Sequence, residues 1–201
     1  VNLRLQHNFM RAYLLSSLIL LVLAANSFAQ KPDWENPKVF KQGTEKPRAT
    51  FYLFNSVEKA KENQPFSSEN YVLLNGNWKF HWSEHPDKRP LTFFEEGFDV
   101  SGWNEIPVPS NWQLHGYGYP IYTNWKYPHK KSAPKIKGDF NPVGSYKTQF
   151  NISDLWDGKQ VLLHFGGAGS AYNVWVNGKK VGYSEGTKTP AEFDITEHIR
   201  K

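Results

Sequence analysis

Residues 161–184 read VLLHFGGAGSAYNVWVNGKKVGYS, and this stretch has the clearest strand pattern in the sequence. Its second half contains Asn177-Gly178, a dipeptide that favours the type I′ turn of a two-residue β-hairpin. Apolar side chains alternate with polar ones on both sides of that turn: Tyr172, Val174 and Val176 before it, Val181 and Tyr183 after it. A period of two is typical of half-buried strands, so we predict a hairpin here.

Other segments of the chain alternate in the same way. One predicted strand has the apolar residues Trp78, Phe80 and Trp82. It follows Asn75-Gly76, which we expect to form another tight turn. Residues 146–152 alternate before Asp157-Gly158, and residues 161–165 alternate after it. Short strands separated by turn residues favour an all-β sandwich over a fold of alternating strands and helices.

The composition is that of a folded domain without covalent cross-links. Hydrophobic residues make up 39% of the 201 residues and aromatic residues 16%, which is enough apolar surface for one core. The sequence has no cysteine, so no disulfide can stabilise it.

The first residues have the pattern of a secretory signal peptide. Arg11 follows the single methionine, Met10, and an apolar stretch covers residues 14–25. Ser27-Phe28-Ala29 then provides a small-x-small cleavage site. The apolar stretch is shorter than the roughly 20 residues that span a bilayer. We therefore expect residues 1–29 to be removed, leaving a secreted or periplasmic protein with no membrane segment.

Residues 30–70 are polar, contain several prolines and show no sustained period. We interpret them as an extended arm that lies over the domain or reaches a partner subunit. Its single candidate helix covers residues 56–62. The predicted division is therefore residues 1–29, the arm at 30–70 and a β-domain at 71–201.

Residues 107–144 lack alternation but are rich in Gly, Pro, Tyr and Trp, which indicates a long ordered loop. A run of lysines lies within it, at Lys126, Lys130, Lys131, Lys135 and Lys137. We interpret this run as a solvated loop rather than a patch for nucleic acid, because secretion removes nucleic-acid partners.

Five stretches together carry a resemblance to a known family. They are DWENP at 33–37, LNGNWKF at 74–80, VPSNWQLHGYGYPIYTN at 108–124, the stretch at 161–184, and PAEFDIT at 190–196. In this order they resemble the N-terminal domain of the β-galactosidases of glycoside hydrolase family 2. The resemblance implies a jelly-roll β-sandwich of the galactose-binding-domain type, with a further core strand expected after residue 199, so that the sandwich is incomplete at the C-terminus.

The resemblance also implies hydrolysis of terminal β-galactosides by a complete enzyme whose catalytic glutamates lie in another domain. A retaining glycosidase needs two carboxyl groups about 5 to 5.5 Å apart. Glu95, Glu96 and Asp99 do not match the family's catalytic pair, and we interpret them as part of a solvated loop. The alternatives left open are a free-standing carbohydrate-binding module and a family member of other specificity, a β-glucuronidase or β-mannosidase.

Asn124 is the residue that the resemblance places in the substrate site. In the family, this asparagine hydrogen-bonds galactosyl hydroxyls and the next residue, here Trp125, contributes through its backbone. An amide offers both donors and an acceptor to sugar hydroxyls. From residue chemistry alone, an Asx-turn that stabilises the loop is the alternative.

The arm motif implies a structural Mg²⁺ site formed by Asp33, Asn36 and the Val39 carbonyl. The alternative is a local cap by Asn36. Mg²⁺ and Na⁺ are the cofactors that the resemblance implies for the complete enzyme, together with a homo-oligomer formed through the arm. Trp78 and Trp175 are expected to be core residues rather than stacking platforms for sugars.

Overall fold

The computed structural model describes residues 31–120, 129, 131–136 and 140–200. The strands in these residues are β1 (Lys41–Gln42), β2 (Gly76–Ser83), β3 (Asn104–Val108), β4 (Val143–Lys147), β5 (Leu162–Phe165), β6 (Ala171–Val176), β7 (Lys179–Glu185) and β8 (Ala191–Asp194). The helix α2 covers Val57–Lys61. Short 3-10 helices cover Asp33–Glu35, Pro65–Ser67, Pro86–Lys88, Trp112–His115, Asp154–Trp156 and Thr196–His198.

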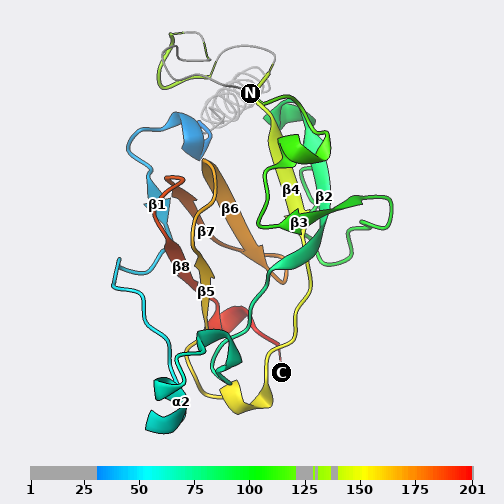
Figure 1. Cartoon of the computed structure of the whole chain (residues 1–201). Coiled ribbons are helices and arrows are strands. Elements are labelled where there is room, and N and C mark those ends of the chain that lie inside the picture. The colour runs from blue at the N-terminus through cyan, green and yellow to red at the C-terminus, as the bar shows by residue number, and fades with distance from the viewer. Residues whose placement is uncertain (1–30, 121–128, 130, 137–139, 201) are drawn as a thin grey trace, which may run out of the picture.

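The strands form an all-β sandwich, as the sequence predicts. Their order is β1-β7-β6 in one sheet, β3-β2-β4 in a second and β5-β8 in a third, and every pairing is antiparallel. Figure 1 shows β3-β2-β4 on one side of the molecule and the other two sheets on the opposite side. The described residues contain no helix that is long and apolar enough to cross a membrane.

The predicted hairpin of β6 and β7 is confirmed. Val176 pairs with Lys179, so the connection has two residues. Asn177 has φ 47° and Gly178 has φ 78°, the pair of positive values that a type I′ turn requires. Val174 pairs with Gly182 and Trp175 with Lys180, so β7 has one extra residue, Val181, opposite this step of β6.

Two predictions about strand boundaries are wrong. The tight turn expected at Asn75-Gly76 does not form, because Asn75 is not among the residues with a positive φ and Gly76, with φ 146°, is already the first residue of β2. The partners of β2 are β3 and β4, both further along the chain. The alternation at 146–152 also extends beyond its strand, since β4 ends at Lys147 and pairs with β2.

The main core lies between β8 and the β6-β7 hairpin. Phe193 and Tyr183 are both 0% exposed, and Val161, Val174, Ala191 and Ile195 are buried with them. Gly182 makes this packing possible: a Cβ there would lie 2.6 Å from the Phe193 ring and 2.3 Å from the Gln42 carbonyl oxygen. The missing side chain therefore lets both the core ring and the arm approach β7 closely.

The arm joins two of the sheets. Lys41 and Gln42 pair with β7, and Thr44 then forms a bridge to Phe193 in β8. Further along, α2 begins after Ser56, whose hydroxyl accepts a hydrogen bond from the Lys59 amide at 3.2 Å. The helix falls within the predicted range. Of the two roles expected for the arm, lying over the domain is the one that these contacts show.

Candidate functional site

Asn124 and Trp125 lie outside the described residues, as do Lys126, Lys130, Lys137 and the predicted signal peptide. The structure describes both ends of the loop that carries Asn124. Those ends determine how the loop is held on the domain.

The incoming end of the loop packs on the aromatic face of β2. The Phe80 ring stacks on Trp112 at 6.1 Å between centroids and meets Tyr117 edge-on at 4.8 Å. The Tyr117 hydroxyl accepts a hydrogen bond from Asn104 Nδ2 at 2.9 Å. Phe80 itself is 1% exposed, so the loop is anchored to a fully buried residue.

The two ends of the loop also contact each other. The Tyr119 ring stacks on Phe140 at 4.8 Å with an interplanar angle of 20°. Beyond Phe140, the Asn141 amide donates to the Glu84 carbonyl at 3.0 Å, just after β2. Stacked rings thus join the two described ends of the loop, at Tyr119 and Phe140.

Two of the three carboxylates at 95, 96 and 99, those of Glu96 and Asp99, have structural partners. Asp99 Oδ1 accepts the Ser101 amide at 2.8 Å, and this backbone hydrogen bond is the main cause of the lowered pKa of Asp99. Glu96 forms an ion pair with Arg200. All three side chains belong to exposed residues, in agreement with a solvated loop. A glycosidase acid needs the opposite, a raised pKa in a dry site.

The arm residues proposed for Mg²⁺ come together in one turn. The Asn36 amide donates to the Asp33 carbonyl at 3.0 Å, and the Val39 amide donates to the Asn36 carbonyl at 2.8 Å. Asn36 Oδ1 accepts the Lys38 amide at 3.2 Å, which is the local cap expected as the alternative. Asp33 receives Gln42 Nε2 on Oδ1 and Lys180 Nζ on Oδ2, each at 3.3 Å.

Glu185 is a further carboxylate at this turn that sequence reasoning missed. The buried Tyr183 hydroxyl donates to Glu185. Burial raises the pKa of Tyr183, and the hydrogen bond to Glu185 and the negative charges of Glu185 and Asp33 raise it further. Glu185 and Asp33 therefore both raise the pKa of the Tyr183 hydroxyl. Among the described residues, however, no three His, Cys, Asp or Glu side chains are grouped as metal ligands.

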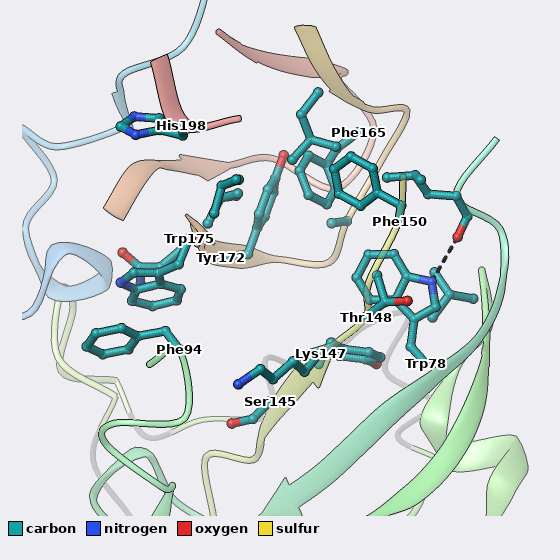
Figure 2. A pocket seen from close by; sticks show the side chains of 18 of the residues that line it. Trp78, Phe94, Ser145, Lys147, Thr148, Phe150, Phe165, Tyr172, Trp175 and His198 are labelled. Atoms are coloured by element: carbon teal, nitrogen blue, oxygen red, sulfur yellow. Dashed lines mark hydrogen bonds between the residues drawn. The ribbon is translucent and has the colours of Figure 1, made fainter. Parts of the chain in front are cut away.

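A large cleft separates the β3-β2-β4 sheet from the opposite sheets. Its volume is about 2520 Å³, well above the roughly 300 to 1,000 Å³ of a small-molecule site. Figure 2 shows Trp175 and Tyr172 on one side and Trp78 and Thr148 on the other. The Trp175 ring stacks on Phe94 at 5.2 Å, and Trp78 Nε1 donates to the Leu74 carbonyl at 2.8 Å. Both tryptophans are half-buried cleft residues, so their prediction as core residues is wrong.

Comparison with known proteins identifies the family. Residues 72–201 match the family described as glycosyl hydrolases family 2, sugar binding domain. The chain belongs to this family.

The similar proteins include bacterial β-galactosidases. The chain is 42% identical to a β-galactosidase of Priestia megaterium, in a match that covers 85% of this chain and 17% of the relative. It is 41% identical to a β-galactosidase of Psychromonas ingrahamii, in a match that covers 84% of this chain and 16% of that relative. It thus spans about a sixth of the length of these relatives. Among solved structures, a calcium-binding mutant of Bacteroides uniformis β-glucuronidase 2 is 26% identical, with a TM-score of 0.46 over 64% of this chain and 13% of that one.

Proposed function

We propose that this chain is the N-terminal sugar-binding portion of a retaining β-galactosidase, which hydrolyses terminal non-reducing β-D-galactose residues. The observation that carries the proposal is the similarity over most of the chain to proteins named β-galactosidase. The motif at 108–124 supports the same branch of the family. The chain alone contributes no catalytic glutamate pair; it provides scaffold and one substrate contact.

That substrate contact is Asn124, with the Trp125 backbone beside it. The loop that carries them is closed by the Tyr119–Phe140 stack and anchored on Phe80 through Trp112 and Tyr117. The Asn124 amide would offer donors and an acceptor to sugar hydroxyls, and such matching is how sugar-binding sites discriminate between substrates.

Asn124→Ala in the complete enzyme should fold normally and lose turnover. Losing hydrogen bonds to substrate hydroxyls costs about 1 to 3 kcal/mol of transition-state binding, or roughly 5- to 150-fold in kcat/KM. The measurement is release of nitrophenol from nitrophenyl β-D-galactoside. Asn111→Ala is the matched control, because Asn111 is an exposed residue of the same loop with no side-chain capping bond. Equal kinetics for wild type and Asn124→Ala would remove Asn124 from the site.

We also propose that the arm turn holds Mg²⁺ in the complete enzyme. Asp33, Asn36 and the Val39 carbonyl would hold it, with Glu185 as an additional oxygen donor, and oxygen atoms of this kind are what Mg²⁺ prefers. The ion would fasten the arm to β7. Lys180 is a competing cation, since its ammonium group already contacts Asp33.

Added MgCl₂ should therefore raise the thermal unfolding temperature of the protein, and Asp33→Asn should abolish this effect. Asp154→Asn, which changes an exposed aspartate at the start of another 3-10 helix, should leave the effect unchanged. An unfolding temperature that EDTA and MgCl₂ do not alter would exclude a magnesium ion at this turn. We assign no residue of the chain to Na⁺.

Secretion and assembly through the arm belong to the same proposal. The arm leaves large apolar side chains exposed, namely Phe40, Phe51, Leu53, Val57 and Phe66, and such residues are typical of a surface that contacts a partner. The partner proposed is a second copy of the enzyme. Light scattering gives the molar mass of the enzyme with and without residues 30–70, and the mass should fall to that of a smaller assembly when the arm is removed.

Sequencing the N-terminus of the mature protein tests signal cleavage, and Gln30 should be its first residue.

A further inference from the structure

A β-bulge directs one lysine of β7 towards the arm. Val181 is the extra residue of the bulge, and it lies between Lys180 and Gly182, which both have partners in β6. Side chains alternate between the two faces of a strand, so in a regular strand Lys180 and Gly182 would share the face that packs on β8. The extra residue shifts this alternation by one position. Lys180 therefore lies on the other face of β7, together with Tyr183.

The arm brings a carboxylate and an amide to that face. β1 lies beside β7 (Figure 1), where Gln42 pairs with Tyr183, and Asp33 belongs to the 3-10 helix before β1. Lys180 Nζ lies 3.3 Å from Asp33 Oδ2 and 3.5 Å from Gln42 Oε1. Gln42 Nε2 in turn donates to Asp33 Oδ1 at 3.3 Å. The side chains of Asp33, Gln42 and Lys180 thus form a closed ring of contacts that joins the arm to β7.

Lys180 supplies the positive charge in this ring. The Asp33 side chain is 15% exposed, whereas the Lys180 side chain is 44% exposed. A carboxylate that is largely removed from water is unfavourable unless hydrogen bonds and an opposite charge compensate for the lost hydration. The Gln42 amide is neutral, so the compensating charge at Asp33 comes from the ammonium group. This contact is the one that a metal ion at the turn would also make.

The charges at the junction favour one cation at a time. Glu185 accepts the Tyr183 hydroxyl beside the same turn, so the junction contains two carboxylates, those of Asp33 and Glu185. With Lys180 in contact, these three side chains have one net negative charge. A magnesium ion in place of the ammonium group would make the junction neutral, whereas both cations together would leave a net positive charge. Like charges in contact with the same carboxylate repel each other strongly.

We propose that Lys180 is a built-in cation of the arm junction, which holds the arm on β7 without metal and must leave Asp33 when Mg²⁺ binds there. This inference rests on the magnesium site proposed above and concerns its affinity. The ammonium group is tethered beside Asp33, so it competes at a fixed local concentration that dilution does not lower. The arm therefore stays docked in the absence of the ion, and Mg²⁺ replaces one cationic contact by another.

The experiment compares Lys180→Met with Lys179→Met in the full-length protein. Methionine keeps an unbranched apolar side chain but removes the charge, and Lys179 is the neighbouring exposed lysine of β7. Hydrogen exchange of the Glu185 amide reports docking of the arm, because this amide donates to the Phe40 carbonyl at 3.2 Å. Isothermal titration with MgCl₂ gives the dissociation constant for Mg²⁺ in each protein.

In EDTA, the Glu185 amide should exchange about tenfold faster in Lys180→Met than in the wild type, because the arm has lost the cation that holds it. In the same variant, the dissociation constant for Mg²⁺ should be lower by about tenfold, because no ammonium group has to be displaced from Asp33. Saturating MgCl₂ should then restore slow exchange of the Glu185 amide. Lys179→Met should match the wild type in both measurements.

Equal dissociation constants for the wild type and Lys180→Met would overturn the inference and leave the magnesium site in place. Unchanged exchange of the Glu185 amide in EDTA would also overturn it, since the arm would then be held without the ammonium group. Binding of Mg²⁺ to neither protein would be a different failure, because it would reject the magnesium site itself and the competition with it.

Discussion

Residues 30–201, expressed without further domains, should release no nitrophenol above background from nitrophenyl β-D-galactoside. Retaining hydrolysis requires an acid/base carboxyl and a nucleophilic carboxylate about 5 to 5.5 Å apart. Two carboxylates that could be mistaken for this catalytic pair make structural contacts instead. Glu96 forms an ion pair with Arg200, and Asp99 accepts a hydrogen bond from the Ser101 amide. Since removing both catalytic groups eliminates most of the rate enhancement of an enzyme, the expected loss is of many orders of magnitude.

The control for this result is the same chain joined to the remaining domains of the Priestia megaterium relative, assayed at equal molar concentration. Hydrolysis by the isolated chain that survives repeated purification and disappears in Glu95→Gln or Asp99→Asn would contradict the account. Such a result would mean that the loop at 93–103 contains the catalytic carboxylates.

Phe193→Ala should lower the free energy of unfolding by about 3 to 5 kcal/mol, the usual cost of removing a buried phenylalanine side chain. Phe193 is 0% exposed, and its ring lies 5.9 Å from Phe165 and 6.4 Å from Tyr172 between centroids. Its backbone also pairs with Thr44. The variant should therefore loosen both the core and the arm, and thermal unfolding should shift downward by roughly 6 to 20 °C.

Leu155→Ala is the matched control, because Leu155 is 63% exposed and should change the unfolding temperature by little. Urea unfolding followed by tryptophan fluorescence gives the free energy directly. A loss below about 1 kcal/mol in Phe193→Ala would mean that this ring is not the centre of the core, since most buried phenylalanines cost more.

Local patterns predicted the elements whose partners are neighbours in sequence. The β6-β7 hairpin is one example, because both strands and the turn lie within residues 171–185 and the turn chemistry of Asn177-Gly178 sets the register. Asn75-Gly76 has the same composition but precedes a strand whose partners are β3 and β4. Turn propensity alone does not fix the backbone conformation, so the tight turn predicted at Asn75-Gly76 is wrong.

Contacts between distant segments could not be predicted in this way. Asp33 and Lys180 are 147 residues apart and meet because the arm pairs with β7. No local pattern around Glu185 signals its place beside this turn. Alternation likewise placed Trp78 on the inner face of its strand, but it does not show that a cleft lies against that face. The proposal that Asn124 and Trp125 contact substrate rests on the family motif, because no spacing rule marks these residues.

The central claim is that this domain belongs to an enzyme specific for β-galactosides. The most direct test is kcat/KM of the complete enzyme on nitrophenyl β-D-galactoside, β-D-glucuronide and β-D-mannoside under one condition. A site built to hydrogen-bond one set of hydroxyls rejects sugars that leave its polar groups unpaired, so the galactoside should be preferred by at least about 100-fold. A higher kcat/KM on the glucuronide or the mannoside would contradict the claim and assign the domain to another branch of the family.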